Sequence, residues 1–366
     1  MRVFLSPPFM NGETERQLVA EAFASNYIAP CGPMVDAFEH EAAERFGQEH
    51  ALATVSGTMA LELLARALDI GPGDTIVASD LTFIASVAPF ASRGARPVFV
   101  DADPNAWCIN PVLAEQALER HPEARLLVAT DLYGQSCDLD ALLEVCDRHG
   151  VPLVVDAAES VGATYKGRPA GQGAWATIHS FNGNKIITTG GGGMLLSNDA
   201  NLMALCRKLA GQAREAVPWY EHRMLGTHGR LGNIPAAIGL GQLRHLDDAL
   251  RDKRAVWEGW RDVLGDKAWC DFMPIAPTGV PNYWLTVVTL KEASPMTAVN
   301  ALAARGIEAR PLWKPMHLQP VFAACEAVLD GTSDRLFACG LCLPSGRGLD
   351  RKIMIETVNI LEGVCS

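Results

Sequence analysis

The stretch "RLLVATDLYGQSCDLDALLEVCDRHGVPLVVD" (residues 125–156) decides the fold class. It begins and ends with short apolar runs rich in branched residues, 125–130 and 151–156, which are typical of buried strands. Between them, Asp138 is a suitable N-cap and Gly150 a suitable C′ residue for a helix. A strand, a helix and a second strand in this order predict parallel strands joined by a helical crossover.

The same alternation of short apolar runs with helical patterns recurs along the first half of the chain. Further strands are expected at residues 74–79, 96–101, 176–181 and 192–198. This pattern predicts an α/β fold in which helices cover a mixed, mostly parallel sheet.

A smaller α+β domain is expected to follow. Residues 235–265 have long helical sequence that joins two regions. The strand, helix and turn-rich segment that come next lie at 283–290, 295–306 and 308–320. A chain of 366 residues suggests roughly two domains at about 150 residues each. We therefore expect a large domain at 1–245 and a small C-terminal domain at 246–366.

Composition narrows the functional classes. The chain is 49% apolar, contains no apolar run of 18 residues, and opens with prolines and acids, so we expect neither export nor membrane insertion and a cytoplasmic location. The net charge of −11 is spread without basic runs, which argues against nucleic-acid binding. The ten cysteines include one CxxC, Cys339 to Cys342, without a second pair, so reduced thiols and no metal site are expected.

Ligands of an open parallel sheet bind beyond the carboxyl ends of its strands, and three groups of polar residues follow predicted strands. The first is Ser56-Gly57-Thr58, which precedes a helical pattern. A helix N-terminus with free amides, a glycine and two hydroxyls predicts a phosphate site. A capped helix without a ligand is the alternative.

The second group is Asp156, at the end of a strongly apolar strand, with Glu159 three residues later. A buried carboxylate requires a partner, so we expect a cation nearby. The alternative is an aspartate that only caps a helix.

The third group lies in "SFNGNKIITTGGGGM" (180–194), where Lys185 follows the strand that carries Ser180. A lysine held away from water can become neutral and nucleophilic and form a Schiff base. The four glycines 190–193 allow the backbone to approach a planar ligand, but no Gly-Lys-Ser/Thr ends the run as in a P-loop. A surface lysine before a turn is the alternative.

Together the three groups match the chemistry of one cofactor, pyridoxal 5′-phosphate (PLP). Its phosphate needs a cradle, its pyridinium nitrogen a carboxylate, and its aldehyde an amine.

Four ordered motifs carry a resemblance to a known family. They are SGTxAL (56–61), DAAxxxGAxYKG (156–167), SFxxNKxxTTGxGG (180–193) and RLGNIPAAIGLGQL (230–243). In these motifs the chain resembles the DegT/DnrJ/EryC1/StrS family of PLP-dependent nucleotide-sugar aminotransferases. Segments 4–39, 310–322 and 331–346 look more narrowly like the subgroup that makes UDP-4-amino-4,6-dideoxy-N-acetylglucosamine, as in bacillosamine biosynthesis.

The resemblance implies a PLP-dependent transferase of fold type I, like aspartate aminotransferase, and roles for the residues of the motifs. It makes Lys185 the Schiff-base lysine and the acid/base, and Asp156 the partner of the pyridinium nitrogen. Ser56, Gly57, Thr58 and Ser180 would hold the phosphate. Phe83 would lie against one face of the ring, unless it is a core phenylalanine. Glu159 stands where many members have glutamine near the cofactor hydroxyl.

The segment "GTHGRLGN" (226–233) departs from the family pattern. His228 stands where many members have an asparagine that reaches the PLP phosphate of the neighbouring subunit. The resemblance thus implies a homodimer with shared active sites. His228 can still donate a hydrogen bond to phosphate, but Asn233 or Arg230 could take this role instead.

The expected substrates are L-glutamate, as amino donor, and a UDP-linked 4-keto-6-deoxy sugar. Candidate residues for the sugar nucleotide are Asn26, Tyr27, Trp313, Lys314, His317 and Gln319. An aromatic ring beside a cation suits a base and a phosphate, although Trp313 could be a packing residue and His317 a satisfied loop histidine. The alternatives are a GDP-4-keto-6-deoxymannose aminotransferase of perosamine type and a non-catalytic protein that binds a sugar nucleotide.

Overall fold

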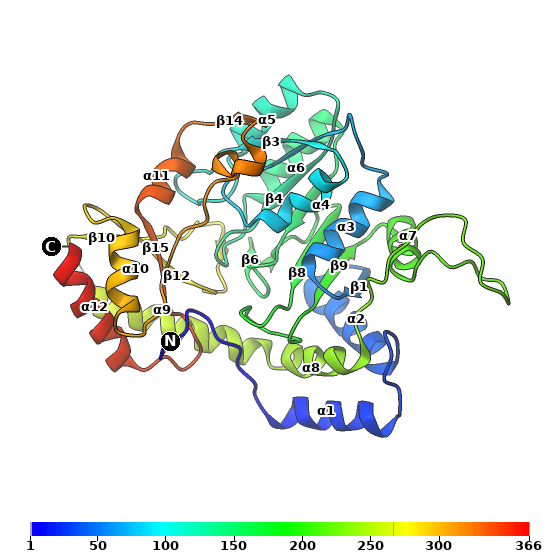
Figure 1. Cartoon of the computed structure of the whole chain (residues 1–366), viewed down its shortest axis with the longest axis horizontal. Helices are drawn as coiled ribbons and strands as arrows, with labels where there is room; N and C mark the ends of the chain where they lie inside the picture. Colours follow the sequence, from blue (N-terminus) through cyan, green and yellow to red (C-terminus); the bar gives the residue numbers. More distant parts are fainter. Residues whose placement is uncertain (1, 266, 366) are drawn as a thin grey trace.

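A sheet of eight strands organises most of the chain (Figure 1). The computed structural model describes residues 2–265 and 267–365. The strand order is β1-β9-β8-β5-β4-β2-β3-β14, and β9 alone runs against the common direction. The strands are β1 (His50–Thr54), β2 (Thr75–Ser79), β3 (Arg96–Val100), β4 (Ala124–Thr130), β5 (Leu153–Asp156), β8 (Ala176–Ser180), β9 (Gly193–Ser197) and β14 (Glu326–Val328).

Helices cover both faces of this sheet, because successive residues of each buried strand point to opposite sides. In β4, Leu127 packs into one core cluster and Val128 into the other. The first cluster includes α2 (Pro33–Phe46), α5 (Pro111–Arg120), α6 (Leu139–His149) and α8 (Asn233–Arg244), with α1 (Glu13–Ala24) packed against α8. The second includes α3 (Gly57–Ala67), α4 (Ala88–Ser92) and α7 (Ala200–Ala210). The α/β fold with a mostly parallel sheet is therefore confirmed.

Local capping agrees with the sequence pattern in α6. The side chain of Asp138 accepts a hydrogen bond from the amide of Ala141, and Gly150 adopts a left-handed conformation after the last turn. The connection between the neighbouring strands β8 and β9, residues 181–192, contains no helix, and β9 runs antiparallel to β8.

The C-terminal part forms a second α+β unit, as expected. Its antiparallel sheet has the order β10-β12-β15-β13, and its own apolar core includes Trp260 and Leu302. The strands are β10 (Cys270–Phe272), β12 (Thr286–Leu290), β13 (Arg310–Pro311) and β15 (Gly340–Leu343). The helices are α9 (Leu246–Leu264), α10 (Pro295–Ala303), α11 (Thr332–Cys339) and α12 (Arg351–Cys365). The short elements are η1 (Ile84–Ser86), η2 (Met316–Leu318), η3 (Pro320–Phe322) and a sheet of β11 (Gly279–Val280), β6 (Thr164–Tyr165) and β7 (Arg168–Pro169).

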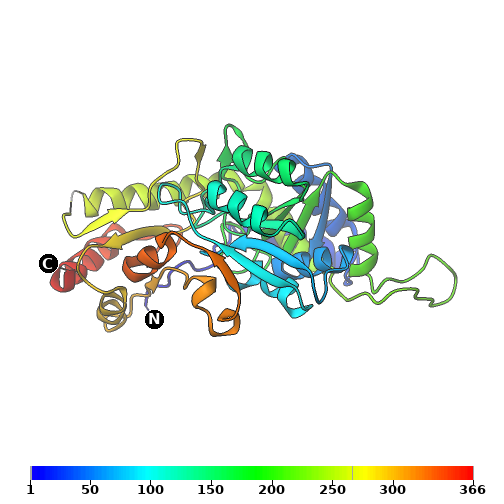
Figure 2. The same ribbon diagram turned by 90° about the horizontal axis from the view of Figure 1, so that it is seen from above.

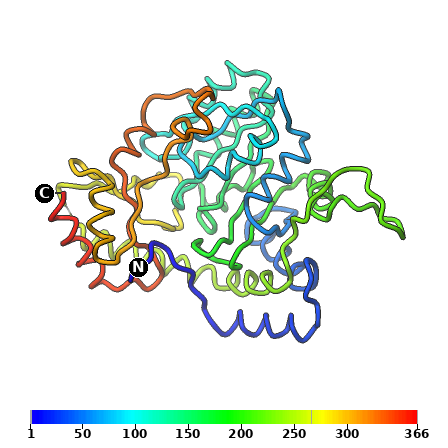
Figure 3. The backbone as a smooth tube through the Cα atoms, in the orientation of Figure 1, coloured from blue at the N-terminus to red at the C-terminus, as the bar shows by residue number. Residues whose placement is uncertain are grey.

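Two segments connect the parts of the chain on either side of residue 245. Strand β14 pairs with β3 at the edge of the large sheet, and near the N-terminus Val3 pairs with Ile307. The tube in Figure 3 shows the N-terminal segment running beside the C-terminal unit. His245 separates α8 from α9. The domain boundary at this position stays a prediction.

Residues 212–228 project from the body of the molecule (Figures 1 and 2). Trp219, Tyr220 and Leu225 in this segment are 61%, 82% and 88% exposed. We call residues 212–228 the arm. Within the described ranges, no helix has both the length and the apolar character needed to cross a membrane.

Candidate active site

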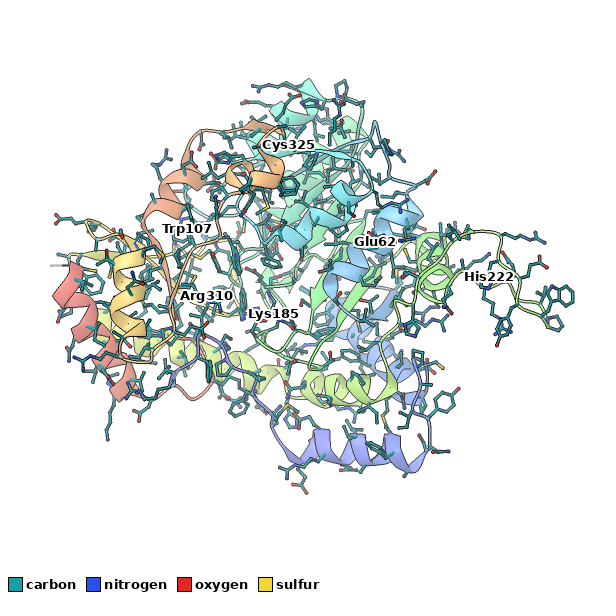
Figure 4. The ribbon with its side chains drawn as sticks, viewed as in Figure 1. Glu62, Trp107, Lys185, His222, Arg310 and Cys325 are labelled. Carbon is teal, nitrogen blue, oxygen red and sulfur yellow. The ribbon has the colours of Figure 1, made fainter. Side chains whose placement is uncertain are left out.

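A cavity of about 500 Å³ opens beyond the carboxyl ends of the parallel strands. In Figure 4, Lys185 and Arg310 lie between the large sheet and the C-terminal unit. The predicted site residues that line the cavity are Ser56, Gly57, Thr58, Phe83, Asp156, Glu159, Ser180, Lys185 and Trp313. The fold thus brings the three post-strand groups together in one space of a size typical for a small-molecule site.

The first turn of α3 forms one wall of the cavity. Ser56 is the N-cap, and its Oγ accepts a hydrogen bond of 3.1 Å from the amide of Met59. The amides of Gly57 and Thr58 come first in the helix, where no preceding turn can accept their hydrogen bonds. Gly193 passes so close that a Cβ there would lie 2.2 Å from the nitrogen of Gly57. Only glycine fits at this position, and the result is a cradle suited to an anion.

Asp156 ends β5 at the floor of the cavity and is 5% exposed. Its Oδ2 accepts a hydrogen bond of 2.6 Å from Ser86 Oγ, and its Oδ1 accepts one of 3.1 Å from the amide of Ala158. Burial raises the pKa of Asp156, while the Ser86 hydrogen bond and the charge of Lys185 act in the opposite direction. Lys185 is thus a cation that acts on Asp156, although its ion pair is with Glu159.

Lys185 lies in the loop between β8 and β9, and its side chain is 12% exposed. The loop is closed by a hydrogen bond of 2.8 Å from the amide of Phe181 to the carbonyl of Gly192. Lys185 Nζ lies 3.8 Å from Glu159 Oε1 and 3.8 Å from the centre of the Trp284 ring. Burial lowers the pKa of Lys185, and the carboxylates of Glu159 and Asp156 partly oppose this. The amine is thereby shifted toward its neutral, nucleophilic form.

Glu159 is buried and uses both of its oxygens. Oε2 accepts a hydrogen bond of 2.8 Å from the amide of Tyr133, and Oε1 accepts one of 3.2 Å from Trp313 Nε1. Burial raises the pKa of Glu159, while Lys185 lowers it. The side chain faces the reactive lysine rather than solvent.

Aromatic rings form a further wall. The Trp313 ring lies 5.4 Å from that of Phe83, and stacks at 6.1 Å on that of Tyr133. The amide of Trp313 also donates a hydrogen bond of 2.8 Å to the Tyr133 hydroxyl. Phe83 is 52% exposed, so it is not a core residue and can face a planar ligand.

The other candidates for the sugar nucleotide do not line this cavity. Asn26 and Tyr27 are exposed between α1 and α2. Gln319 Nε2 donates to the carbonyl of Lys314 at 3.1 Å. His317 is held between two carboxylates, with Nδ1 2.8 Å from Asp80 Oδ2 and Nε2 3.3 Å from Asp334 Oδ1. These contacts favour the interpretation of His317 as a satisfied loop histidine. Lys314 does not line the cavity either, and the binding roles of these five residues stay predictions.

His228 and Asn233 differ sharply in their surroundings. Asn233 is 1% exposed; its Oδ1 accepts from the amide of Met34 at 3.0 Å, and its Nδ2 donates to the carbonyl of Tyr27 at 3.0 Å. Both polar atoms of the Asn233 side chain are used within the fold, so this geometry does not support a contact between Asn233 and the PLP phosphate. His228 is exposed at the base of the arm, beside Arg230, in a second cavity of about 630 Å³.

Sequence reasoning missed several residues of the cavity, and three of them contact the key groups or add charge. Ser86 supports Asp156, Trp284 lies beneath the amine of Lys185, and Arg310 adds a second cation to the lining. Arg310 donates to Glu308 Oε1 at 2.7 Å and keeps 63% of its side chain exposed. None of them belongs to the four ordered motifs, although Arg310 begins segment 310–322, which carries the narrower resemblance.

The donor set of the cavity fits PLP. It combines an anion cradle, a buried carboxylate for a pyridinium nitrogen and a buried amine for an aldehyde. With the mostly parallel sheet and the C-terminal α+β unit, this site defines a PLP-dependent enzyme of fold type I.

Comparisons with known proteins agree with this class. The sequence model of the DegT/DnrJ/EryC1/StrS aminotransferase family matches residues 10–362. EpsN of Bacillus subtilis (strain 168) is 42% identical over 369 residues, which cover 98% of this chain and 95% of EpsN. GDP-perosamine synthase of Caulobacter vibrioides is 36% identical over 370 residues, which cover 99% and 98%. The structure of the aminotransferase TlmJ from Streptoalloteichus hindustanus superimposes with a TM-score of 0.92 at 28% identity, over 100% of both chains.

The chain belongs to the DegT/DnrJ/EryC1/StrS aminotransferase family. It is a sugar aminotransferase that depends on PLP, as the four sequence motifs predicted.

Proposed function

We propose that the chain transfers the amino group of L-glutamate to the C4 ketone of a UDP-4-keto-6-deoxy-N-acetylhexosamine, giving a UDP-4-amino-4,6-dideoxy sugar. The observation that carries the transfer is the buried amine of Lys185, which faces Glu159 in the cavity that also contains Asp156 and the N-terminus of α3. The UDP sugar is supported by the resemblance of segments 4–39, 310–322 and 331–346 to the bacillosamine subgroup.

Different residues of the cavity would bind different parts of the cofactor. The N-terminus of α3 and Ser180 would hold the phosphate, Asp156 the ring nitrogen, and Phe83 one face of the ring. PLP, when bound, supplies an electron sink for the carbon from which a proton is removed. Asp156 supports that chemistry because its negative charge favours a protonated ring nitrogen.

Lys185 acts as nucleophile and as proton carrier. In its neutral form, Nζ can attack a carbonyl carbon and can accept a proton from carbon. Glu159 Oε1, at 3.8 Å, favours the protonated form of the same nitrogen and so opposes the effect of burial. Arg310 offers a charge for an anionic group of either substrate.

A GDP-4-keto-6-deoxymannose aminotransferase is the second candidate. It is favoured by the likeness to GDP-perosamine synthase along nearly the full length of both chains. Both candidates use the same half-reaction with L-glutamate, and they differ only in the sugar nucleotide that accepts the amino group.

The test follows the absorbance of the bound cofactor. We expect L-glutamate to bleach the band of the PLP form, and UDP-4-keto-6-deoxy-N-acetylglucosamine to restore it. If only the GDP-linked sugar restores the band, the second candidate is correct. If L-glutamate has no effect, the amino donor is wrong.

Substitution of Lys185 tests its role as the reacting amine, and substitution of Lys166 is the matched control. We expect Lys185→Ala to fold but to lose turnover by about a millionfold, because both half-reactions need the same nitrogen. Lys166→Ala removes a lysine that is paired with Asp140 outside the cavity, and it should leave turnover unchanged. Normal turnover by Lys185→Ala would overturn the assignment. The homodimer with shared sites and the cytoplasmic location stay predictions.

A further inference from the structure

A second lysine, Lys253, is buried next to the site without contact to its cavity. It lies in α9 and is 3% exposed. Its Nζ donates hydrogen bonds to Ser6 Oγ at 3.1 Å, to the carbonyl of Trp284 at 3.1 Å and to the carbonyl of Ser345 at 2.6 Å. One side chain therefore joins α9, the N-terminal segment, the chain before β12 and the chain after β15.

Two of these contacts lead to the peptide bond before Lys185. Ser6 Oγ donates a hydrogen bond of 2.9 Å to the carbonyl of Asn184, and Trp284 Nε1 donates one of 2.6 Å to the same carbonyl. The ring of Trp284 lies beneath Lys185 Nζ, with its centre 3.8 Å away. Two of the three residues that Lys253 contacts, Ser6 and Trp284, thus also hold the peptide bond before Lys185.

Trp284 is fixed on both sides of its backbone. Its amide donates to Asn282 Oδ1 at 2.8 Å, and Asn282 Nδ2 donates to the carbonyl of Glu159 at 2.8 Å. Its carbonyl accepts from Lys253. The position of the ring relative to Lys185 and Glu159 therefore depends on Lys253 from one side and on Asn282 from the other.

The hydrogen bonds of Lys253 require its ammonium form. Two partners are carbonyls, and the hydroxyl of Ser6 already gives its hydrogen to Asn184, so all three oxygens can only accept. Burial and the guanidinium of Arg347 oppose that charge and lower the pKa of Lys253 to about 7. Arg347 is itself paired with Asp252 at 2.6 Å.

Packing alone would not select a lysine at this position. All three hydrogen-bond partners are uncharged oxygens, so the desolvation of the ammonium is not offset by an opposite charge in direct contact. A methionine of similar length would avoid that desolvation, and such replacements of buried charges are often neutral or stabilising. The lysine therefore contributes something other than a filled core.

We propose that Lys253 is a positioning residue for Lys185, which it holds in place through Ser6 and Trp284. This inference rests on the proposed function in taking Lys185 as the reacting amine. Loss of the ammonium frees Ser6 and the Trp284 carbonyl, loosens both donors to Asn184, and lets water reach Lys185 Nζ. Burial is the main cause that lowers the pKa of Lys185, so that pKa then rises toward its ordinary range.

The first measurement uses Lys253→Met and L-glutamate alone. We expect the rate of the cofactor absorbance change at saturating L-glutamate to fall about tenfold, since a small misplacement of a reacting group is costly, while the half-saturating concentration changes little. Arg254→Met is the matched control, because Arg254 is a neighbour on α9 that pairs at the surface with Glu258.

The second measurement determines the pH at which Lys185 titrates, and it does not depend on turnover. The full-length protein, freed of cofactor, is labelled competitively with acetic anhydride at a series of pH values, and the peptide of Lys185 is quantified by mass spectrometry. In Lys253→Met, Lys185 should titrate at a higher pH than in the wild type, whereas the exposed Lys352 should not change. An unchanged Lys185 titration, with only a change in thermal stability, would make Lys253 a purely structural residue.

Ser6→Ala keeps the proposal testable if Lys253→Met does not fold. It removes the hydroxyl that joins Lys253 Nζ to the carbonyl of Asn184, so it should shift the Lys185 titration in the same direction. The double variant, Ser6→Ala with Lys253→Met, should shift that titration no further than Lys253→Met does. No shift in Ser6→Ala would overturn the route through Ser6. A protein that ignores L-glutamate would refute the proposed function, yet the labelling would still decide the role of Lys253.

Discussion

The hydroxyl of Ser86 connects the charge of Asp156 to a small polar network. Ser86 Oγ donates to Asp156 Oδ2 and lies 2.8 Å from Thr82 Oγ1, which lies 2.9 Å from Thr130 Oγ1. Burial raises the pKa of Asp156, and this hydrogen bond is the largest opposing cause. Ser86 therefore helps to keep the carboxylate ionised where a pyridinium partner needs it.

Ser86→Ala should make PLP binding more sensitive to acid. The substitution removes a contact that lowers the pKa of Asp156, so that pKa rises further. Since the protonated carboxyl loses its attraction for a positively charged ring nitrogen, affinity should begin to fall at a higher pH during acidification than in the wild type. Binding of PLP to the cofactor-free protein, followed by absorbance from pH 8 to pH 5, measures this shift.

Ser92→Ala is the control for this experiment. Ser92 is in the neighbouring α4, and its Oγ donates only to the carbonyl of Pro89 at 2.9 Å. It should bind PLP with the same pH profile as the wild type. Coincident profiles for Ser86→Ala and the wild type would mean that Ser86 does not influence the charge of Asp156.

Strand ends, but not strand directions, are encoded in the local sequence. The buried strands β2, β3, β4, β5 and β8 have strong apolar patterns. Asp156, at the end of β5, and Lys185, in the loop after β8, were found for that reason. The direction of β9 depends on its hairpin connection to β8, because a strand covered on both faces shows the same apolar run in either direction.

Other parts of the site depend on contacts distant in sequence. Strand β14 has only three residues, and it becomes a strand through pairing with β3. Trp284 and Arg310 reach the cavity because the C-terminal unit packs over the large sheet. No local periodicity reports that packing, so sequence reasoning could identify the cradle, the carboxylate and the lysine but not these two side chains.

The short helix η2 is attached to the large sheet through Asp80, which follows β2 and is fully buried. Asp80 Oδ1 accepts from the amide of His317 at 2.9 Å, and the carbonyl of Asp80 accepts from the amide of Met316 at 2.8 Å. Burial raises the pKa of Asp80, while its contacts with His317 lower it. The His317 ring also lies against Asp334 on α11, so it joins three elements.

His317→Ala should destabilise the protein by about 3 kcal/mol, because it leaves the buried carboxylate of Asp80 without its ring partner. Thermal unfolding measures the loss. The half-saturating concentration of the sugar nucleotide should not change, since His317 does not line the cavity. His40→Ala, which removes an exposed histidine paired with Glu44, is the control for stability. A stable His317→Ala variant with weaker substrate binding would instead support the binding role expected from the sequence.

At the scale of the whole molecule, the arm and the second cavity have features of an interface. The second cavity is lined by five basic side chains, Lys208, Arg214, His222, His228 and Arg230, and Lys208 is paired with Glu215 at 2.7 Å. The arm exposes Trp219, Tyr220 and Leu225, and His222 lies on it away from Lys185 (Figure 4). Exposed aromatic and apolar residues together with a group of basic side chains suit a contact with a partner that carries an anion.

Mixing two inactive variants tests whether that partner is a second copy of the chain. If His228 completes the cavity of a twofold-related neighbour, a mixed dimer of Lys185→Ala and His228→Ala contains one site with both residues intact. Half of the dimers in an equal mixture are mixed, so about one quarter of all sites should regain function. The control mixture pairs Lys185→Ala with Asp156→Ala. Both residues line the cavity of one subunit, so neither site of that mixed dimer is intact and no activity should return. If subunit exchange is verified by mass spectrometry and the first mixture stays inactive, His228 acts within its own subunit or not at all.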